Sequence, residues 1–241
     1  MTVLRGGLFG AALLVVEAAA CAQPSLGVEL SSDQRRRGLS WSDGRPTVEA
    51  SVSAPVGGLV TLGAGASALR DSARHGGADV GIDLSAHVQR DLGPWQLSGG
   101  VTGHVFAGAS GLSYVEIDGR VSQSLGPARI SAGASYAPAQ GAIGGDNLYL
   151  SAGLDLGVPG TPLSLYGRVG RSSGRVDDAV RAMRLRPAGH YWDHAVGVEY
   201  LAGPFALGLR YTDTDIGAVA AGPYADAHVG ARLAGVARVR F

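Results

Sequence analysis

The chain has 241 residues and a formal net charge of zero, with 20 basic and 20 acidic residues. All of the basic residues are arginines, and their balance with acidic residues excludes the strongly basic composition typical of nucleic-acid-binding proteins. Beyond the N-terminal segment, no apolar stretch reaches the roughly 20 residues that a membrane-spanning helix requires. The composition therefore excludes a helical membrane protein and leaves one barrel or one large all-β domain.

The N-terminal segment has the order of features found in a secretory signal. Arg5 supplies a positive charge, residues 8–16 form a short apolar core, and Ala20-Cys21-Ala22 fits a small-residue cleavage site. We predict a signal peptide over residues 1–22 and a mature domain over residues 23–241, so that cleavage removes the only cysteine. The alternative is a lipoprotein acylated at Cys21, although no leucine stands three residues before it.

A motif rich in arginine and serine follows over residues 30–46. It resembles the N-terminal hairpin of the TorF family, whose members are described as porin-like. The positions that match are Ser32, Asp33, Arg37, Gly38, Ser40, Ser42 and Pro46. Gln34 and Arg36 depart from the pattern, because the family usually has aromatic residues there. The resemblance implies an outer-membrane barrel and does not identify the solute. The chain length, the spacing of the strands and the terminal phenylalanine also agree with this family, although these features are less specific.

Alternation of apolar and polar residues with a period of two recurs along the mature chain. Because successive side chains of a strand point to opposite faces, this pattern indicates strands with one apolar and one polar face. Clear examples span residues 80–89, 95–104, 114–122, 148–156 and 205–212.

Short turns alternate with longer polar connections between these strands. The short turns contain Gly57-Gly58, Gly93-Pro94, Gly126-Pro127, Pro159-Gly160 and Gly203-Pro204, and the long connections span residues 34–45, 70–77, 107–111, 138–146, 172–189 and 213–224. This layout is typical of outer-membrane barrels, in which the long loops lie outside the cell. We predict about twelve antiparallel strands. Their expected starts are Leu26, Thr47, Gly58, Ala78, Trp95, Leu112, Ala128, Asn147, Pro162, Tyr191, Phe205 and Asp226.

The C-terminal segment carries the strongest strand pattern. Every second residue from Val229 to Phe241 is apolar or small, and the residues between them include His228, Arg232, Arg238 and Arg240. A terminal strand with one apolar and one charged face, ending in an aromatic residue, looks like the assembly signal of outer-membrane barrels. We therefore assign Val239 and Phe241 to that signal and expect the barrel assembly machinery as a partner.

A secreted β-sandwich is the main rival fold, because its strands alternate too. A sandwich needs a dry core of large aliphatic and aromatic residues. Here the apolar face contains much alanine and glycine, and aromatic residues make up only 6%. The expected fold is an all-β, up-and-down transmembrane β-barrel with a single domain, located in the bacterial outer membrane.

Strand phase assigns a set of ionisable side chains to the inner face of this barrel. They would line an aqueous lumen and set ion preference, or they would pair with one another and fill the lumen. If the first strand meets the last, Glu29 and Asp33 are expected near Arg238 and Arg240. The candidate lumen-lining residues are Glu29, Asp33, Glu49, Asp83, His87, His104, Glu116, Asp118, Arg120, Arg129, Asp155, Arg168, Glu199, Arg210, Arg232, Arg238 and Arg240.

No catalytic, cofactor or metal site is expected. His190 and His194 are four residues apart, but at a loop-to-strand junction that spacing does not bring two imidazoles to one ion. For a lipid-hydrolysing enzyme, no serine stands out as a partner of His194. The expected partners are outer-membrane lipid, lipopolysaccharide and small solutes.

The function expected from these features is a porin-like channel for passive passage of small solutes or ions. The connection over residues 172–189 carries several arginines, which either fold inward as a constriction or, as we favour here, lie outward against lipopolysaccharide. A non-conducting structural or adhesion barrel that acts through its outer loops is the alternative. A lipid-modifying enzyme is a third possibility.

Overall fold

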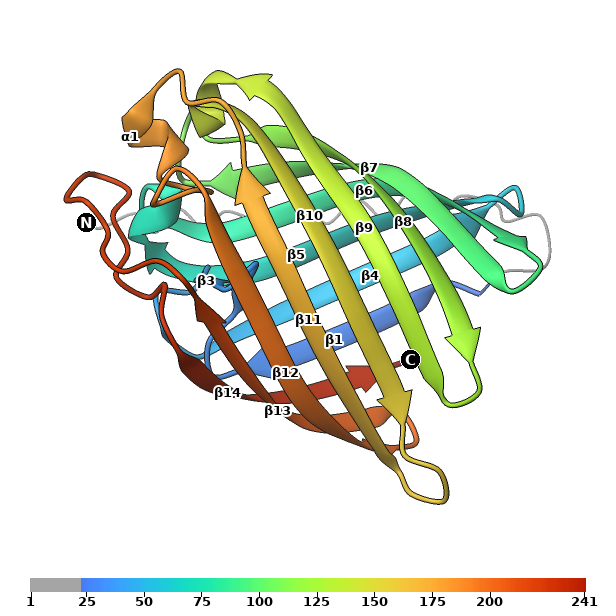
Figure 1. Cartoon of the computed structure of the whole chain (residues 1–241). Helices are drawn as coiled ribbons and strands as arrows, with labels where there is room; N and C mark the ends of the chain where they lie inside the picture. The colour runs from blue at the N-terminus through green and yellow to red at the C-terminus, as the bar shows by residue number, and fades with distance from the viewer. Residues whose placement is uncertain (1–22) are drawn as a thin grey trace, which may run out of the picture.

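The computed structural model describes residues 23–241, and the proposed signal peptide lies outside the described residues. Its main feature is a closed barrel of twelve antiparallel strands (Figure 1). The wall strands are β1 (Ser25–Ser31), β4 (Thr47–Val56), β5 (Val60–Ser72), β6 (Ala78–Leu92), β7 (Trp95–Ala107), β8 (Tyr114–Leu125), β9 (Ala128–Gln140), β10 (Gly145–Gly157), β11 (Leu163–Ser173), β12 (Tyr191–Ala202), β13 (Phe205–Thr214) and β14 (Arg232–Arg240). The predicted all-β, up-and-down barrel with one domain is confirmed.

Each wall strand pairs with its neighbours in the chain, and the first strand closes the barrel against the last. At this seam between β1 and β14, Val28 pairs with Val239 and Glu29 pairs with Arg238. Closure leaves the wall without an edge, which is the condition for a sheet whose backbone groups are surrounded by lipid.

The two faces of the wall differ as the period-two pattern predicts. Large apolar side chains stand exposed on the outer face, including Leu84 at 54%, Leu207 at 60% and Leu233 at 62% of their accessible surface. They do not meet one another across a two-layer core, so the sandwich is excluded. An exposed apolar band of this kind suits contact with hydrocarbon. Within residues 23–241, no helix is both long and apolar enough to cross a bilayer.

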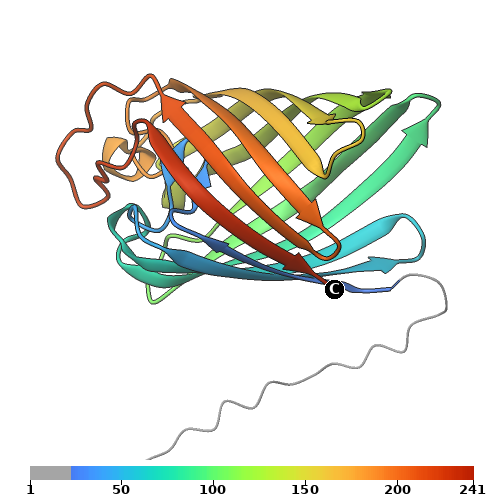
Figure 2. The same ribbon diagram turned by 90° about the horizontal axis from the view of Figure 1, so that it is seen from below.

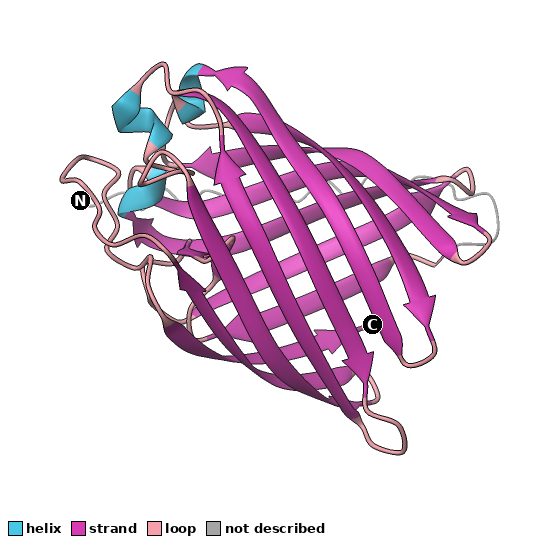
Figure 3. Ribbon diagram, in the orientation of Figure 1, coloured by secondary structure: helices cyan, strands magenta, loops and turns pink. Residues whose placement is uncertain are grey.

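The two ends of the barrel have different connections (Figures 1 and 2). At the end that holds Ser25 and Arg240, the strands are joined by tight turns in which Gly93, Gly126 and Gly203 each adopt φ 60°. Glycine accepts this left-handed conformation without the steric penalty of a Cβ. At the opposite end lie the long loops and the helical segments η1 (Ala73–His75), η2 (Gly141–Ile143) and α1 (Ala179–Ala182) (Figure 3).

One expected strand boundary is wrong. The segment from Asp226 to Ala231 is a loop, and β14 begins at Arg232. Asp226 is buried beside Arg74, and Val229 packs in an apolar cluster with Leu39. The apolar-polar alternation before Arg232 therefore reflects loop packing and does not continue the strand.

A short hairpin lies inside the barrel near the long-loop end. It is formed by β2 (Arg35–Arg36) and β3 (Leu39–Ser40), which pair as a separate two-stranded sheet between β1 and β4 (Figures 1 and 2). Its tight turn uses Arg37 at φ 53° and Gly38 at φ 74°. The chain thus returns into the lumen instead of extending outward as a free loop.

Candidate functional site

The hairpin is anchored to the inner wall by two of its arginines. Arg36 forms an ion pair with Asp83 at 2.6 Å and approaches Glu49 at 3.6 Å. Arg37 pairs with Glu116, and its guanidinium lies 4.4 Å from the centre of the Tyr149 ring. Consecutive residues of the hairpin therefore bind different wall strands: Arg36 binds β4 and β6, and Arg37 binds β8 and β10.

Arg35 anchors the hairpin to the last loop of the chain. Its Nη2 donates to the backbone carbonyls of His228 at 3.1 Å and Gly230 at 2.9 Å. Its Nη1 lies 3.3 Å from the carboxylate of Asp33, which is buried and also accepts a 2.6 Å hydrogen bond from Ser40. Asp33 follows β1 and is not a strand residue, so its predicted place on the first strand is wrong. The side chain instead stabilises the base of the hairpin.

A packed apolar cluster closes the long-loop end above the hairpin. It combines the hairpin with wall strands and with the loop between β11 and β12. Its larger members are Trp41, Leu69, Phe106, Leu112, Tyr114, Ile143 and Leu185. Buried side chains therefore fill this end of the barrel.

The apolar cluster and the loops that contribute to it form a cap at the long-loop end. Arginines of the β11–β12 loop stabilise this cap. Arg184 is fully buried and donates to three backbone carbonyls, those of Arg74 at 3.2 Å, Leu112 at 2.8 Å and Ala142 at 2.6 Å. Burial lowers the pKa of Arg184 to about 10, so the group stays charged at neutral pH. Arg186 is likewise buried against loop carbonyls. The favoured outward placement of this loop is thus wrong for these two arginines.

A polar cavity of about 350 Å³ lies in the lumen beneath the hairpin. Most of its ionisable lining residues are paired. Arg168 lies 3.2 Å from Asp155, and Arg238 lies 3.5 Å from Glu199. The lining residues are Arg35, Arg37, Gly38, Tyr149, Asp155, Ser164, Tyr166, Arg168, Asp193, Ala195, Glu199, Arg210, Thr212 and Arg238.

The remaining candidates form smaller groups on the inner wall. His87 contacts Asp118 at 3.0 Å and His104 contacts Asp83 at 2.7 Å. Arg120 and Arg129 bind serine hydroxyls. Arg232 lies 3.8 Å from Asp33 at the start of β14. Arg240 lines a cavity of about 190 Å³ with Glu29, Glu49 and Arg238.

The seam brings together only part of the set expected there. Glu29 accepts two hydrogen bonds from Arg238, at 2.9 and 2.8 Å. Asp33 lies beyond the end of β1 and meets Arg35 and Arg232 instead of Arg240. The structure therefore places a charge pair at the closing contact of the barrel, in which two Arg238 nitrogens donate to one oxygen of Glu29.

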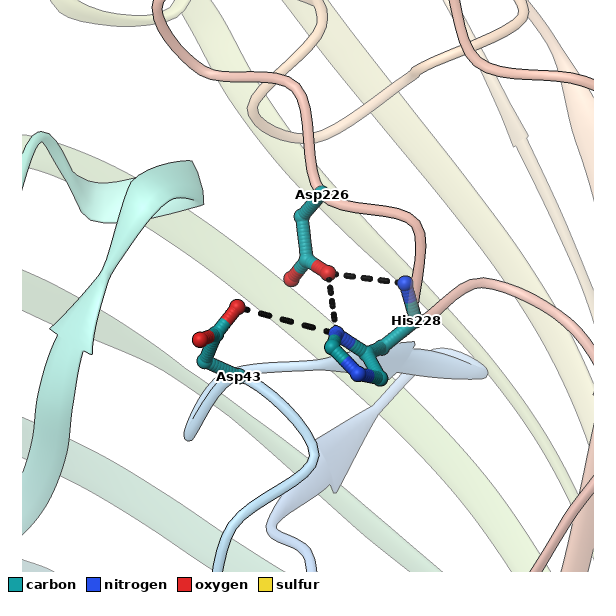
Figure 4. A group of neighbouring side chains, drawn as sticks. All are labelled: Asp43, Asp226 and His228. Atoms are coloured by element: carbon teal, nitrogen blue, oxygen red, sulfur yellow. Dashed lines mark hydrogen bonds and ion pairs between the residues drawn. The ribbon is translucent and has the colours of Figure 1, made fainter.

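A second cluster joins the hairpin to the β13–β14 loop (Figure 4). The Nδ1 atom of His228 lies 2.8 Å from Asp226 and 3.6 Å from Asp43. These three residues have the spacing of metal ligands, but Asp226 also lies 3.5 Å from the Arg74 guanidinium. Arg74 supplies the positive charge beside Asp226, and the His228 imidazole already bonds the Asp226 carboxylate. We therefore interpret Asp43, Asp226 and His228 as a contact that joins two loops, and we call it the clasp.

The burial of several residues that build the site was not predicted. Arg74 and Trp41 lie outside the wall strands, Tyr191 was assigned as a strand start, and Arg184 as one of the arginines of residues 172–189. No periodicity reveals burial at these positions. The run Arg35-Arg36-Arg37 was visible as a motif, although its inward direction was not. His194, considered for catalysis, is exposed on the outer face, with its ring 6.1 Å from that of Tyr211.

Comparisons with solved structures agree with the barrel architecture. A NanC porin structure matches with a TM-score of 0.59 and 10% identity, over 90% of this chain and 98% of that chain. A protein from work on in-meso crystallization of membrane proteins matches with a TM-score of 0.54 and 10% identity, over 90% and 83% of the two chains. LpxR from Salmonella typhimurium matches with a TM-score of 0.46 and 9% identity, over 90% and 99%. At these identities, the likeness concerns the fold alone.

The fold and its polar interior define a β-barrel of the type found in bacterial outer membranes. The chain belongs to the Gcw_chp family, described as bacterial proteins of unknown function, whose profile matches residues 16–233. No curated protein sequence matches the chain.

Proposed function

We propose that this protein is a gated, porin-like channel of the bacterial outer membrane that passes small solutes or ions. The observation that carries the proposal is the charged cavity beneath the hairpin, enclosed by a wall whose outer face is apolar. Such a wall suits lipid, and a polar interior suits hydrated solutes. The likeness to a porin fold and the resemblance of the N-terminal motif to the TorF family support the same function.

In the proposed orientation, the tight turns and both ends of the barrel face the periplasm and the long loops face outward. Val239 and Phe241 then lie at the periplasmic rim, where the barrel assembly machinery would bind them. Contact with lipid and lipopolysaccharide belongs to the same proposal. An apolar hollow of about 950 Å³ on the outer face, with Arg70 among its lining residues, supports it.

Passage of solute requires movement of the cap, because the apolar cluster fills the long-loop end. The hairpin and the β11–β12 loop are the elements that would move. Arg37 and Arg184 bind them through side-chain contacts, without a continuous strand ladder. This construction supports gating by local release of the cap while the wall stays closed.

Planar-bilayer recording of the purified, folded protein tests the proposal. We expect infrequent step currents from the native chain. Larger or more frequent steps are expected when residues 34–45 are replaced by a glycine-serine segment of the same length. Heat-dependent gel migration verifies that both proteins are folded barrels. Absence of step currents from both folded proteins would contradict the channel.

The packed cap also favours a second candidate, a non-conducting structural or adhesion barrel. Its tight loop cluster offers an ordered outer surface, held by the clasp of His228 and by Arg184. This candidate predicts no current from either protein in the bilayer experiment.

A further inference from the structure

We propose that Arg210 and Thr212 on β13 form a binding subsite for a small oxyanion, a carboxylate or a phosphate, in the lumen cavity. The inference rests on the proposed function and names the class of solute. Both residues line the cavity of about 350 Å³. They occupy successive inward positions of one strand, so their side chains project into the same space.

Arg210 differs from the other arginines of this cavity. Arg168 and Arg238 form ion pairs with Asp155 and Glu199. Among the described residues, no carboxylate forms an ion pair with Arg210; its Nε donates to the Tyr166 hydroxyl at 2.8 Å. The two terminal nitrogens of the guanidinium form no hydrogen bond within the described chain, and a guanidinium fork matches the two oxygens of a carboxylate or phosphate.

Thr212 supplies a second donor. The residue is 4% exposed, and its Oγ1 has no hydrogen-bond partner within residues 23–241. A buried hydroxyl without a partner costs free energy, and an oxyanion that accepts a hydrogen bond from it would remove this cost. Arg210 therefore reaches the cavity with two unpaired donors, and the Thr212 hydroxyl lies just beneath the cavity wall, where rotation of its side chain would present it to the ligand.

Tyr166 fixes the position of Arg210. A Cβ placed on Gly197 would overlap the Tyr166 ring, so the ring lies directly over this glycine on the neighbouring strand. Only glycine leaves room for the ring there. The hydroxyl on this ring accepts the hydrogen bond from Nε of Arg210. Tyr166 is therefore a positioning residue for the subsite.

The hairpin side of the cavity suggests what else the ligand carries. Asp193 is 5% exposed; one carboxylate oxygen accepts a 3.1 Å hydrogen bond from Tyr149, and the other has no hydrogen-bond partner in the described chain. This oxygen is buried beneath the cavity wall, and rotation of the carboxylate would present it to a hydroxyl group of the solute. The geometry points to a hydroxylated oxyanion small enough for about 350 Å³.

Isothermal titration of the folded protein in detergent micelles tests the subsite, with gluconate, acetate and inorganic phosphate as probes and choline as the cationic control. We expect gluconate to bind more tightly than acetate, and choline not to bind. Arg210→Gln should weaken gluconate binding at least tenfold, and Thr212→Val about threefold. Arg171→Gln makes the same change of charge on the outer face, beside Trp192, and should leave affinity within twofold.

The inference is overturned if none of the three anions binds the native protein. It is also overturned if Arg210→Gln and Arg171→Gln bind gluconate equally, or if choline binds as well as gluconate. Should Arg210→Gln fail to fold, Arg210→Lys and Tyr166→Phe test the same fork and its positioning. Weaker binding by these variants supports the subsite, and unchanged binding overturns it.

Titration does not require passage through the barrel, so it separates this inference from the channel itself. Binding without step currents would retain the subsite and end the channel proposal. Step currents without anion binding would retain the channel and end the subsite. If both hold, the reversal potential in a salt gradient should favour anions, and Arg210→Gln should reduce that preference.

Discussion

The imidazole of His75 lies parallel to the ring of Phe106, with centroids 4.6 Å apart and an interplanar angle of 12°. His75 is 0% exposed, and neither ring nitrogen has a hydrogen-bond partner within the described chain. Burial, followed by the nearby Arg184 and Arg74 charges, lowers the pKa of His75 well below 6.5. The cap of the barrel therefore contains a neutral histidine at the contact between the loops and the wall.

Acidification is expected to loosen the cap. Because the pKa of His75 is lower in the folded state, the stabilisation from its neutral form is complete above about pH 6.5 and decreases as the pH falls below that value. Hydrogen exchange of residues 73–77 and 179–189, corrected for intrinsic rates, should show less protection at pH 5 than at pH 7.5. The frequency of channel opening should rise over the same interval.

His75→Phe provides the control for this pH dependence. Phenylalanine keeps an aromatic ring against Phe106 and removes two unsatisfied nitrogens, so the cap should be as stable as the native one at neutral pH or more stable. Protection of the loops should then be nearly equal at both pH values. A variant that loosens on acidification as much as the native protein would assign the effect to other groups.

Arg184→Met is expected to open the cap without opening the barrel. The substitution keeps a flexible chain of similar length but leaves the carbonyls of Arg74, Leu112 and Ala142 without their donor. The expected local loss is roughly 3 kcal/mol or more, since each of the three orphaned buried carbonyls costs about 1–3 kcal/mol. Limited proteolysis should cleave the β11–β12 loop faster. Arg175→Met, at an exposed pair with Asp177, should not change the rate.

A charge on the outer face should be far more harmful than the same charge on the inner face. Leu84 is exposed on the outside of β6, and Ser85 follows it on the inside. Leu84→Arg should cost about 2–4 kcal/mol of folding free energy in lipid, whereas Ser85→Arg should be tolerated. Urea titration of folding into lipid vesicles measures both. Equal costs would contradict an outer wall in contact with hydrocarbon.

The seam should depend on Arg238 more than on either of its partners. Arg238 binds Glu29 at 2.8 Å and Glu199 at 3.5 Å, and the three side chains are each about a quarter exposed or less. Arg238→Gln leaves two carboxylates unpaired and should cost roughly 1–3 kcal/mol, while Glu29→Gln should cost less. Heat-dependent gel migration ranks the variants. If Glu29→Gln unfolds at a lower temperature than Arg238→Gln, the contact of Arg238 with Glu199 does not contribute to stability as proposed.

The wall could be predicted from the sequence because a strand exposed to lipid on one face and water on the other must alternate. Six of the twelve expected strand starts, among them Thr47, Ala78 and Trp95, coincide with the observed ones, and five more lie within two residues of them. The prediction from alternation was wrong near Asp226. Polar and apolar residues alternate there too, but Asp226 is buried against Arg74 in a loop, and the segment forms no strand pairing.

The cap could not be predicted in the same way. Arg184 is buried against backbone carbonyls of distant loops, and Arg186 against carbonyls of its own loop and of Asp146 in β10; these contacts leave no periodic signal. The expectation that the β11–β12 loop faces lipid surfaces followed from its charge alone. Likewise, Arg35 lies inside the barrel because His228 and Gly230 offer carbonyls nearly two hundred residues later in the chain, as the separations of 193 and 195 positions show.

The inward hairpin has a consequence for assembly. It precedes eleven of the twelve wall strands, and its last anchors are the carbonyls just before β14. The contacts of Arg35 are therefore complete only when the segment just before the last strand is in place. Deleting the hairpin should accordingly alter the rate of membrane insertion as well as the behaviour of the mature pore.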